Sequence, residues 1–529
     1  MDTRSCGSRS IKCCSAPFAL APLLWSLAAE FAAGQTDAEV IRGPYLQNGT
    51  ISNVVVRWRT DNATDTRVKF GRQPSMLTWR VLDSALTTEH AITLTNLASD
   101  TKYYYAIGTS NGNLAGDDSY YFITAPSAPK PTRIWAIGDC GTASAGASTW
   151  RDVRDAYTAY AGNRETDVWL MLGDNAYHYG TDAQYQIAVF QSYAQLLRKW
   201  VLWSTVGNHE TYAPLIGKPI SYFDNFTFPA AGEAGGEPSG SENYYSFNYA
   251  DIHFVCLDSE LADNSPGSPM LDWLEADLAA NTKPWTIAFF HSPPYNFGTH
   301  NSDDPFDTAG HLVQMRENVV PVLESHGVDL VLCGHSHSYE RSYLLRGHYG
   351  YSTTLTPEMI KNPGDGRIDG DGAYRKRTSD PATEGAVYVV CGSSGWVTGD
   401  TFIPRYLHPA MFIKLKELGS MVIDVDGKRL DAKFLRETGV IGDSFTIIKD
   451  DSSEDFLRIA TFHVGNGVVT ARWNSVNGRT YRVEKTGNLQ NPDWRPASVE
   501  IEADGASTTW SGPAAPGAHE SYYRVVYLY

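Results

Sequence analysis

Short polar motifs placed directly after apolar, strand-like runs constrain this chain more than any other feature. From Thr132 onward, apolar runs bounded by glycine, proline or polar residues alternate with stretches of helical periodicity. This alternation predicts a layered α/β architecture. The predicted strands are 134–137, 168–172, 286–290 and 328–332, and the predicted helices are 150–161, 183–197, 270–280 and 312–325.

Five motifs follow such strands and carry residue types that bind metal ions. They are Gly-Asp-Cys-Gly at 138–141, Gly-Asp-Asn-Ala-Tyr at 173–177, Gly-Asn-His-Glu at 207–210, His-Ser-Pro-Pro at 291–294 and Gly-His-Ser-His at 334–337. Open α/β sheets bind ligands at the carboxyl ends of their strands, so we expect the motifs to converge on one crevice. A lone Gly-Asp is usually a turn or a helix cap, but the whole set in this order favours one shared site.

The side chains in these motifs suit hard or borderline metal ions. The glycine before each aspartate lets the backbone turn tightly and project the carboxylate into the crevice. One aspartate must bridge if two ions are to lie roughly 3.5–4 Å apart, the separation used for in-line displacement at phosphorus. The set therefore predicts a two-metal hydrolase of phosphate esters. Its oxygen and imidazole ligands are Asp139, Asp174, Asn208, His291, His335 and His337.

On these motifs, and on the β-rich segment that precedes them, the chain resembles a purple acid phosphatase within the calcineurin-like metallophosphoesterase superfamily. The resemblance covers roughly residues 40–450. It implies a dinuclear centre of Fe³⁺ with a divalent zinc, manganese or iron. By position, the Fe³⁺ ligands would be Asp139, Asp174, Tyr177 and His337. The divalent ion would take Asp174, Asn208, His291 and His335, with Asp174 as the bridge.

Further roles follow from the resemblance alone. The phenolate of Tyr177 would favour trivalent iron and cause the family's colour; its alternative is an ordinary half-buried aromatic. His209 matches a histidine that contacts phosphate and protonates the leaving alkoxide, or it only orients its loop. The family often has two adjacent histidines on the substrate loop, where this chain has His300 and Asn301. This departure leaves a catalytic role for His300, and the substrate preference, open.

The favoured function is an acid phosphatase that cleaves phosphate monoesters of small molecules by attack of a metal-bound hydroxide. A phosphodiesterase or nucleotide pyrophosphatase on the same scaffold is the rival among enzymes. A non-catalytic secreted binding protein is the rival from another class, because β-rich modules flank the core. Structural metal sites are coordinatively closed, whereas this ligand set leaves an open face between two ions.

The chain is expected to be multidomain. Residues 40–125 alternate as in a fibronectin-III-like β-sandwich and end in a proline-rich linker at 125–131. A catalytic α/β/β/α sandwich is expected over 132–449, with a β meander near 421–448, and an all-β module over 454–529. Three tryptophans of that module either pack in its core or contact a glycan or cell surface: Trp473, Trp494 and Trp510.

The first 35 residues have the layout of a cleaved signal peptide, with Arg4, Arg9 and Lys12 before the apolar run 16–29. The alternative is a retained anchor. No second long apolar stretch predicts a membrane span, so a soluble, secreted or periplasmic protein is expected. The formal charge of -17 argues against nucleic acid held by bulk charge.

Two smaller expectations concern residues near the site. Glu340 and Arg341 are expected to form a structural ion pair, the alternative being that they position the site electrostatically. The cysteines after the signal segment have no CxxC spacing and are expected in the core, with a disulfide as the alternative. They are Cys140, Cys256, Cys333 and Cys391.

Overall fold

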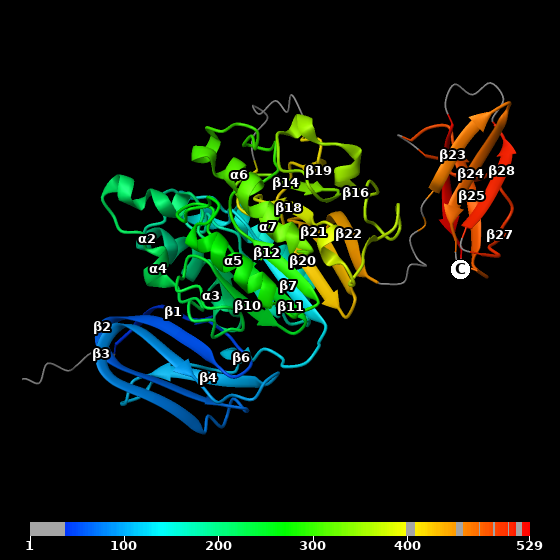
Figure 1. The fold of residues 1–529 in the computed structure, drawn as a ribbon. Helices are drawn as coiled ribbons and strands as arrows, with labels where there is room; N and C mark the ends of the chain where they lie inside the picture. The colour runs from blue at the N-terminus through cyan, green and yellow to red at the C-terminus, as the bar shows by residue number, and fades with distance from the viewer. Residues whose placement is uncertain are drawn as a thin grey trace, which may run out of the picture.

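The computed structural model describes residues 38–397, 408–450, 457, 459–475, 477–489, 492–505, 507–514 and 521–528. The predicted signal peptide lies outside the described residues. Figure 1 shows a β-rich unit near the N-terminus, a large α/β unit, and a second β-rich unit set apart at the C-terminus. None of the helices in the described ranges is long and apolar enough to cross a membrane. The predicted fold class is confirmed, while the exact domain boundaries and the fibronectin-III-like form of the first unit stay proposals.

The N-terminal unit is built from antiparallel strands around one apolar core. β2 pairs with β1, β3 and β4, and β4 also pairs with β5 and β6. Buried aromatic side chains such as Trp58, Tyr105 and Phe122 fill this core. The strands are β1 (Val40–Gln47), β2 (Val54–Gly71), β3 (Trp79–Leu94), β4 (Lys102–Gly108), β5 (Asn113–Ala115) and β6 (Tyr121–Ile123).

Two seven-stranded mixed sheets form the centre of the α/β unit (Figure 1). The first runs in the order β17 (Tyr374–Lys376), β22 (Ile441–Lys449), β21 (Arg429–Arg436), β20 (Gly419–Asp426), β7 (Thr132–Ile137), β8 (Val168–Met171) and β9 (Leu202–Ser204). The second runs β10 (Tyr245–Tyr249), β11 (Ile252–Cys256), β12 (Trp285–Phe289), β13 (Leu330–Cys333), β18 (Val387–Cys391), β14 (Tyr339–Ser342) and β19 (Met411–Leu415). The meander predicted near 421–448 is β20–β22, which extends the first sheet beside β7.

Both faces of the second sheet are buried, which explains why its strands are continuous apolar runs. Along β13, Leu330 and Leu332 face the core shared with the first sheet, whereas Val331 and Cys333 face a second core. That second core includes residues of the helices α5 (Pro269–Ala280) and α7 (Val320–Ser325). The four cysteines are all free and buried, so the expected core placement is confirmed.

Two of the four predicted helices contain a wider turn than their periodicity suggested. The stretch at 183–197 consists of α2 (Asp182–Tyr185), a π-helical segment Gln186–Gln191 and α3 (Ala194–Leu197). The stretch at 312–325 consists of α6 (His311–Gln314), a π-helical segment Met315–Val319 and α7. A π turn adds one residue to a helical turn and appears mostly as a single-turn bulge inside an α-helix. The remaining α-helices of the described residues are α1 (Thr149–Ala161) and α4 (Tyr222–Asn225).

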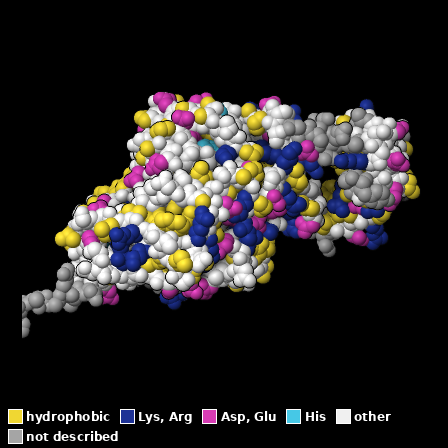
Figure 2. Space-filling model, turned by 90° about the horizontal axis from the view of Figure 1, so that it is seen from below, with side chains coloured by type: hydrophobic (Ala, Val, Ile, Leu, Met, Phe, Trp, Pro, Cys, Tyr) yellow, Lys and Arg dark blue, Asp and Glu magenta, His cyan; other side chains and the backbone are white. Residues whose placement is uncertain are grey.

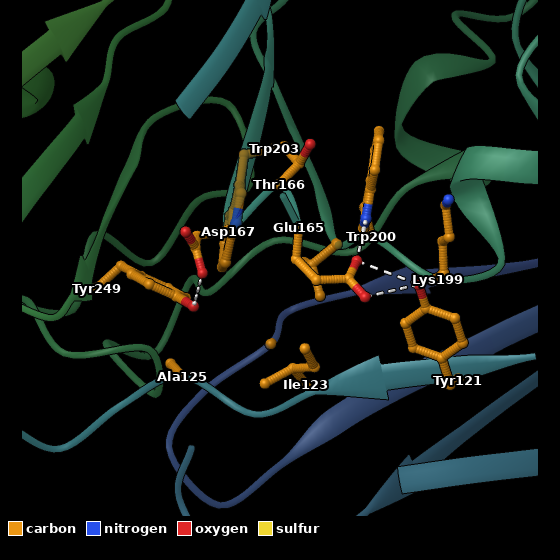
Figure 3. Close-up of a pocket in the computed structure, with 12 residues that line it drawn as sticks. Tyr121, Ile123, Ala125, Glu165, Thr166, Asp167, Lys199, Trp200, Trp203 and Tyr249 are labelled. Carbon is orange, nitrogen blue, oxygen red and sulfur yellow. Dashed lines mark hydrogen bonds between the residues drawn. The ribbon is translucent and has the colours of Figure 1, made fainter. Parts of the chain in front are cut away.

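Paired polar groups fasten the N-terminal unit to the α/β unit. Arg42 is buried and donates to Asp182 Oδ1 at 2.8 Å, and Arg59 donates to Oδ2 of the same carboxylate at 2.7 Å. Beside a cavity of about 30 Å³ between the two units, Glu165 accepts hydrogen bonds from Tyr121 Oη at 2.9 Å and Trp200 Nε1 at 3.4 Å (Figure 3). The two units are therefore joined by specific contacts and not by the linker alone.

The C-terminal unit is a small all-β module. Its strands are β23 (Ile459–Gly465), β24 (Val468–Asn474), β25 (Thr480–Thr486), β26 (Arg495–Pro496), β27 (Ile501–Glu502), β28 (Ser507–Pro513) and β29 (Tyr522–Tyr527). Trp473 is fully buried in its core and Trp510 packs against that core. Arg524 lies over the ring of Trp494 at 4.5 Å. These contacts favour packing over glycan contact for the three tryptophans.

The expected ion pair between Glu340 and Arg341 is not formed. Successive side chains on β14 point to opposite faces, so the two groups cannot meet. Arg341 instead pairs with Asp443, at 2.6 Å and 3.0 Å. Glu340 accepts a hydrogen bond from the backbone N–H of Phe297 at 3.1 Å. Glu340 thereby holds the loop that carries His300.

Candidate metal centre

The motifs that follow β7, β8, β9, β12 and β13 converge at the carboxyl ends of both sheets, as the sequence predicts. All seven side chains proposed as ligands lie in two adjoining groups that meet at Asp174. Buried side chains dominate both groups.

The first group brings a carboxylate, a phenol and an imidazole together. Tyr177 Oη lies 3.2 Å from Asp139 Oδ1 and 3.2 Å from His337 Nε2. His337 Nε2 lies 3.4 Å from Asp139 Oδ1. Asp139, Asp174 and His291 also place ligand atoms within 4.8 Å of one another, which links this group to the second.

The second group is centred on the amide oxygen of Asn208. His291 Nε2 and His335 Nδ1 each lie 3.0 Å from Asn208 Oδ1 and 3.3 Å from each other. His291 Nε2 is also 3.4 Å from Asp174 Oδ1. Separations near 3 Å between ligand atoms are those of neighbouring vertices around a metal ion with bonds of about 2.1 Å.

Hydrogen bonds on the far sides of the rings determine which nitrogens face this point. His291 Nδ1 donates to the carbonyl oxygen of Leu172 at 2.8 Å, so Nε2 is the nitrogen that faces Asn208 and Asp174. Burial lowers the pKa of His291, but the charges of Asp174 and Asp139 outweigh it and raise that pKa to about 9, so a bound metal ion would take the place of the Nε2 proton. The hydroxyl of Thr308 donates to Asp307 at 3.0 Å and accepts from His335 Nε2 at 2.7 Å, which leaves His335 Nδ1 unprotonated. Two imidazole nitrogens and an amide oxygen therefore face one another. A cation between them satisfies all three, so the donor set fits a metal ion.

The first group brings two carboxylates close to a buried phenol. Burial, followed by the negative charges of Asp139 and Asp174, raises the pKa of the Tyr177 phenol well above its ordinary value. Burial also raises the pKa of the Asp174 carboxyl, but the nearby His291 and His209 rings outweigh it and bring that pKa below its ordinary value. The Tyr177 phenol would therefore ionise only with positive charge close by.

Unusual backbone conformations aim several of these side chains inward. Asp139, Asp174 and His335 have φ of 55°, 53° and 68°, a left-handed region that non-glycine residues rarely occupy. Gly173 has φ of 88°, and a Cβ there would lie 2.5 Å from His291 Nδ1. Glycine before Asp174 is thus required both by the turn and by the close approach of the histidine ring.

Glu210 is a functional residue that the sequence interpretation missed, although it closes the Gly-Asn-His-Glu motif. Its Oε2 accepts the backbone N–H groups of Gly207 and Asp174, at 2.8 Å and 2.9 Å. Its Oε1 accepts those of Asn175 and Ala176, at 2.8 Å and 3.1 Å. Burial, and then the charge of Asp174, raise the pKa of the Glu210 carboxyl to about 7. One buried side chain thereby fixes two of the ligand loops.

The two histidines proposed for proton transfer lie on different sides of the centre. His209 Nδ1 donates to the carbonyl oxygen of His178 at 2.9 Å, and its Nε2 lies 3.8 Å from Asp174 Oδ2. His300 Nδ1 lies 2.8 Å from Asp307 Oδ1, and its ring stacks on that of His335 with centroids 3.8 Å apart. Each ring is oriented by a contact through Nδ1, which leaves Nε2 to face a ligand.

A second set of residues that the sequence interpretation missed lines the edge of the site. The ring of Trp396 has its centroid 4.9 Å from that of Tyr177 and 6.0 Å from that of His337. His178, left as a packing or surface residue, has its ring 5.9 Å from Trp396. The only sequence signal for Trp396 was its place after the glycine-rich turn 392–395 that follows β18.

Two parts of the chain match family models. Residues 43–124 match the purple acid phosphatase N-terminal domain, and residues 132–339 match the calcineurin-like phosphoesterase. The second range ends at Tyr339 and so includes the motifs from Asp139 to His337.

Curated relatives agree with these matches. Purple acid phosphatase 22 of Arabidopsis thaliana is 28% identical over 302 residues, which cover 53% of this chain and 62% of the relative. Probable purple acid phosphatase 20 of the same plant is 31% identical over 257 residues, which cover 46% of this chain and 53% of the relative. The chain thus spans between half and two thirds of the length of these relatives.

A solved structure shares the fold. The purple acid phosphatase PPD1 from yellow lupin (Lupinus luteus) seeds superposes with a TM-score of 0.58 at 18% identity, and the match covers 78% of this chain and 75% of that one. At this identity the likeness establishes the architecture alone.

Proposed function

Because the chain contains a calcineurin-like phosphoesterase domain that follows a purple acid phosphatase N-terminal domain, we propose that it is a metal-dependent acid phosphatase acting on phosphate monoesters. The observation that carries this proposal is the convergence of His291 Nε2, His335 Nδ1 and Asn208 Oδ1, within 3.3 Å of one another, beside the Asp174 carboxylate. Two imidazole nitrogens, an amide oxygen and a carboxylate are ligand types that a borderline divalent metal ion binds.

We assign the first group to Fe³⁺ and the second to a divalent zinc, manganese or iron. A phenolate and two carboxylates favour the harder, trivalent ion, and two imidazoles with an amide oxygen suit the divalent one. When bound, the two ions neutralise the oxygens of the phosphate and lower the pKa of a water molecule that attacks phosphorus. The Fe³⁺ ligands are then Asp139, Asp174, Tyr177 and His337, and the divalent ligands are Asp174, Asn208, His291 and His335.

The protein's own contribution is to hold the ligands and to move a proton. His209 receives its orientation from the carbonyl of His178, so its Nε2 is directed at the centre and can protonate the leaving oxygen. His300 is positioned by Asp307 and is the second candidate for that proton transfer. Export remains a proposal that rests on the basic residues and apolar run of the first 35 residues.

Turnover with and without metal tests the proposal. The mature protein, reconstituted with iron and zinc, is expected to release nitrophenol from a nitrophenyl monoester faster than from the matching diester. Removal of the metals by a chelator is expected to abolish release, and adding them back is expected to restore it. Faster diester cleavage would transfer the assignment to a phosphodiesterase. Metal binding with no hydrolysis of either ester would favour a binding protein.

A further inference from the structure

Aromatic rings border the metal centre on the side of Tyr177. Trp396 is half-buried there and His178 is exposed, although the other tryptophans of this unit, such as Trp135 and Trp169, are buried. The rings of Trp396 and His178 are inclined by 31° with centroids 5.9 Å apart, so they lie next to each other. An indole kept partly in water at the edge of a polar site is typical of a ligand contact.

The position of His209 places these rings next to the leaving group. The His209 ring lies 4.4 Å from the ring of Tyr177 and 6.2 Å from that of His178. A general acid must come within hydrogen-bond distance of the oxygen that it protonates. With His209 in that role, His178 and Trp396 are within reach of the alcohol part of the ester.

We propose that Trp396 and His178 form a platform that binds the alcohol part of the substrate, and that the preferred substrates are monoesters whose alcohol carries a planar aromatic ring. Indole offers the largest aromatic face for stacking, and such stacking tolerates any planar ring. Aryl and nucleoside monoesters share this chemistry. The inference rests on the proposed function for the place of the leaving group, but the binding that it predicts is measurable without turnover.

Calorimetric binding of two phosphonates that are not hydrolysed tests the platform. Phenylphosphonate carries the ring and methylphosphonate does not. Trp396→Ala is expected to weaken phenylphosphonate binding about tenfold, the factor for a stacked ring, and to change methylphosphonate binding by less than about twofold. Trp396→Phe, which keeps an aromatic face, is expected to retain most of the affinity. The matched control is Trp79→Ala, which removes a half-exposed tryptophan from β3 of the N-terminal unit.

Equal weakening of both phosphonates, or no change in either, would overturn the platform whether or not the protein is a phosphatase. Turnover distinguishes the two sources of the ring. A rise in KM upon Trp396→Ala for phenyl phosphate alone assigns aryl esters, and a rise for adenosine 5′-monophosphate assigns nucleotides, with glycerol 3-phosphate unchanged in both cases. If Trp396→Ala weakens phenylphosphonate binding alone, but the unaltered protein hydrolyses none of the esters, the proposed function fails and the platform stands.

Discussion

Asp174→Asn is expected to reduce kcat for a phosphate monoester by about a thousandfold or more. Asp174 lies between the two ligand groups: its Oδ1 is 3.4 Å from His291 Nε2, and its charge acts on Tyr177 in the other group. A neutral amide has one acceptor oxygen and no charge, so it cannot bridge two cations. Steady-state kinetics, with the metal content of each preparation measured in parallel, give the comparison.

The matched control for this change is Asp431→Asn. Asp431 lies on β21 and pairs with Arg429, away from both ligand groups. Activity in the control is expected to stay within about twofold of the unaltered protein, because a surface pair contributes at most about 1 kcal/mol. If Asp174→Asn kept more than a tenth of the activity, the assignment of the bridging ligand would be wrong.

Glu210→Ala is expected to lower the free energy of unfolding by about 3–5 kcal/mol and to reduce turnover strongly. The substitution leaves four buried backbone N–H groups without their acceptor, and the four belong to Gly207, Asp174, Asn175 and Ala176. Desolvated donors of this kind cost more than the hydrogen bonds themselves contribute. Urea unfolding followed by tryptophan fluorescence measures the loss.

Glu210→Gln keeps the volume of the side chain and changes only its charge and its hydrogen bonding. The amide keeps one acceptor oxygen for two of the N–H groups but opposes the other two with its own NH₂, so an intermediate loss is expected. Glu275→Ala removes a mostly exposed carboxylate on α5 that pairs with His326, and is expected to cost at most about 1 kcal/mol. A loss for Glu210→Ala no larger than that for Glu275→Ala would contradict the holding role of Glu210.

Residues that belong to a short motif beside an apolar strand were predictable from the sequence. Two apolar runs each predict a strand with a polar side chain at its end. They are 134–137, followed by Gly138-Asp139, and 328–332, followed by Gly334-His335. The geometry of α/β sheets predicts that these polar side chains meet at the carboxyl ends of the parallel strands. The structure shows the two runs as β7 and β13, with the backbone N–H of His335 donating to Asp139 Oδ2 at 2.8 Å.

What the sequence could not predict depends on long-range partners. In the sequence, Glu210 reads as an ordinary acidic residue in the first turn of a helix. It accepts four N–H groups because the loop around Asp174 packs against it in the folded protein. In the sequence, Trp396 is an isolated aromatic residue after a glycine-rich turn. In the structure, the turn that follows β18 places it beside Tyr177. Arg341 follows Glu340 in sequence, yet its partner Asp443 lies on β22. None of these pairings has a local signal.

The sequence gives the net charge of the protein but not how the charged side chains are distributed over its surface. The net charge of -17 indicates an acidic protein, but Figure 2 shows positive and negative side chains interspersed over the face in view. Positive charge for an anionic substrate is therefore expected from the metal ions and not from a broad basic surface on that face.

Anomalous X-ray scattering from crystals of the protein reconstituted with iron and zinc tests the two-metal centre most directly. The account predicts two peaks roughly 3.5–4 Å apart with the Asp174 carboxylate between them, iron on the side of Tyr177 and zinc on the side of Asn208. A single peak would contradict it. So would an ion held instead by His300, Asp307 and His335, the other group of described residues whose ligand atoms lie within 4.8 Å of one another.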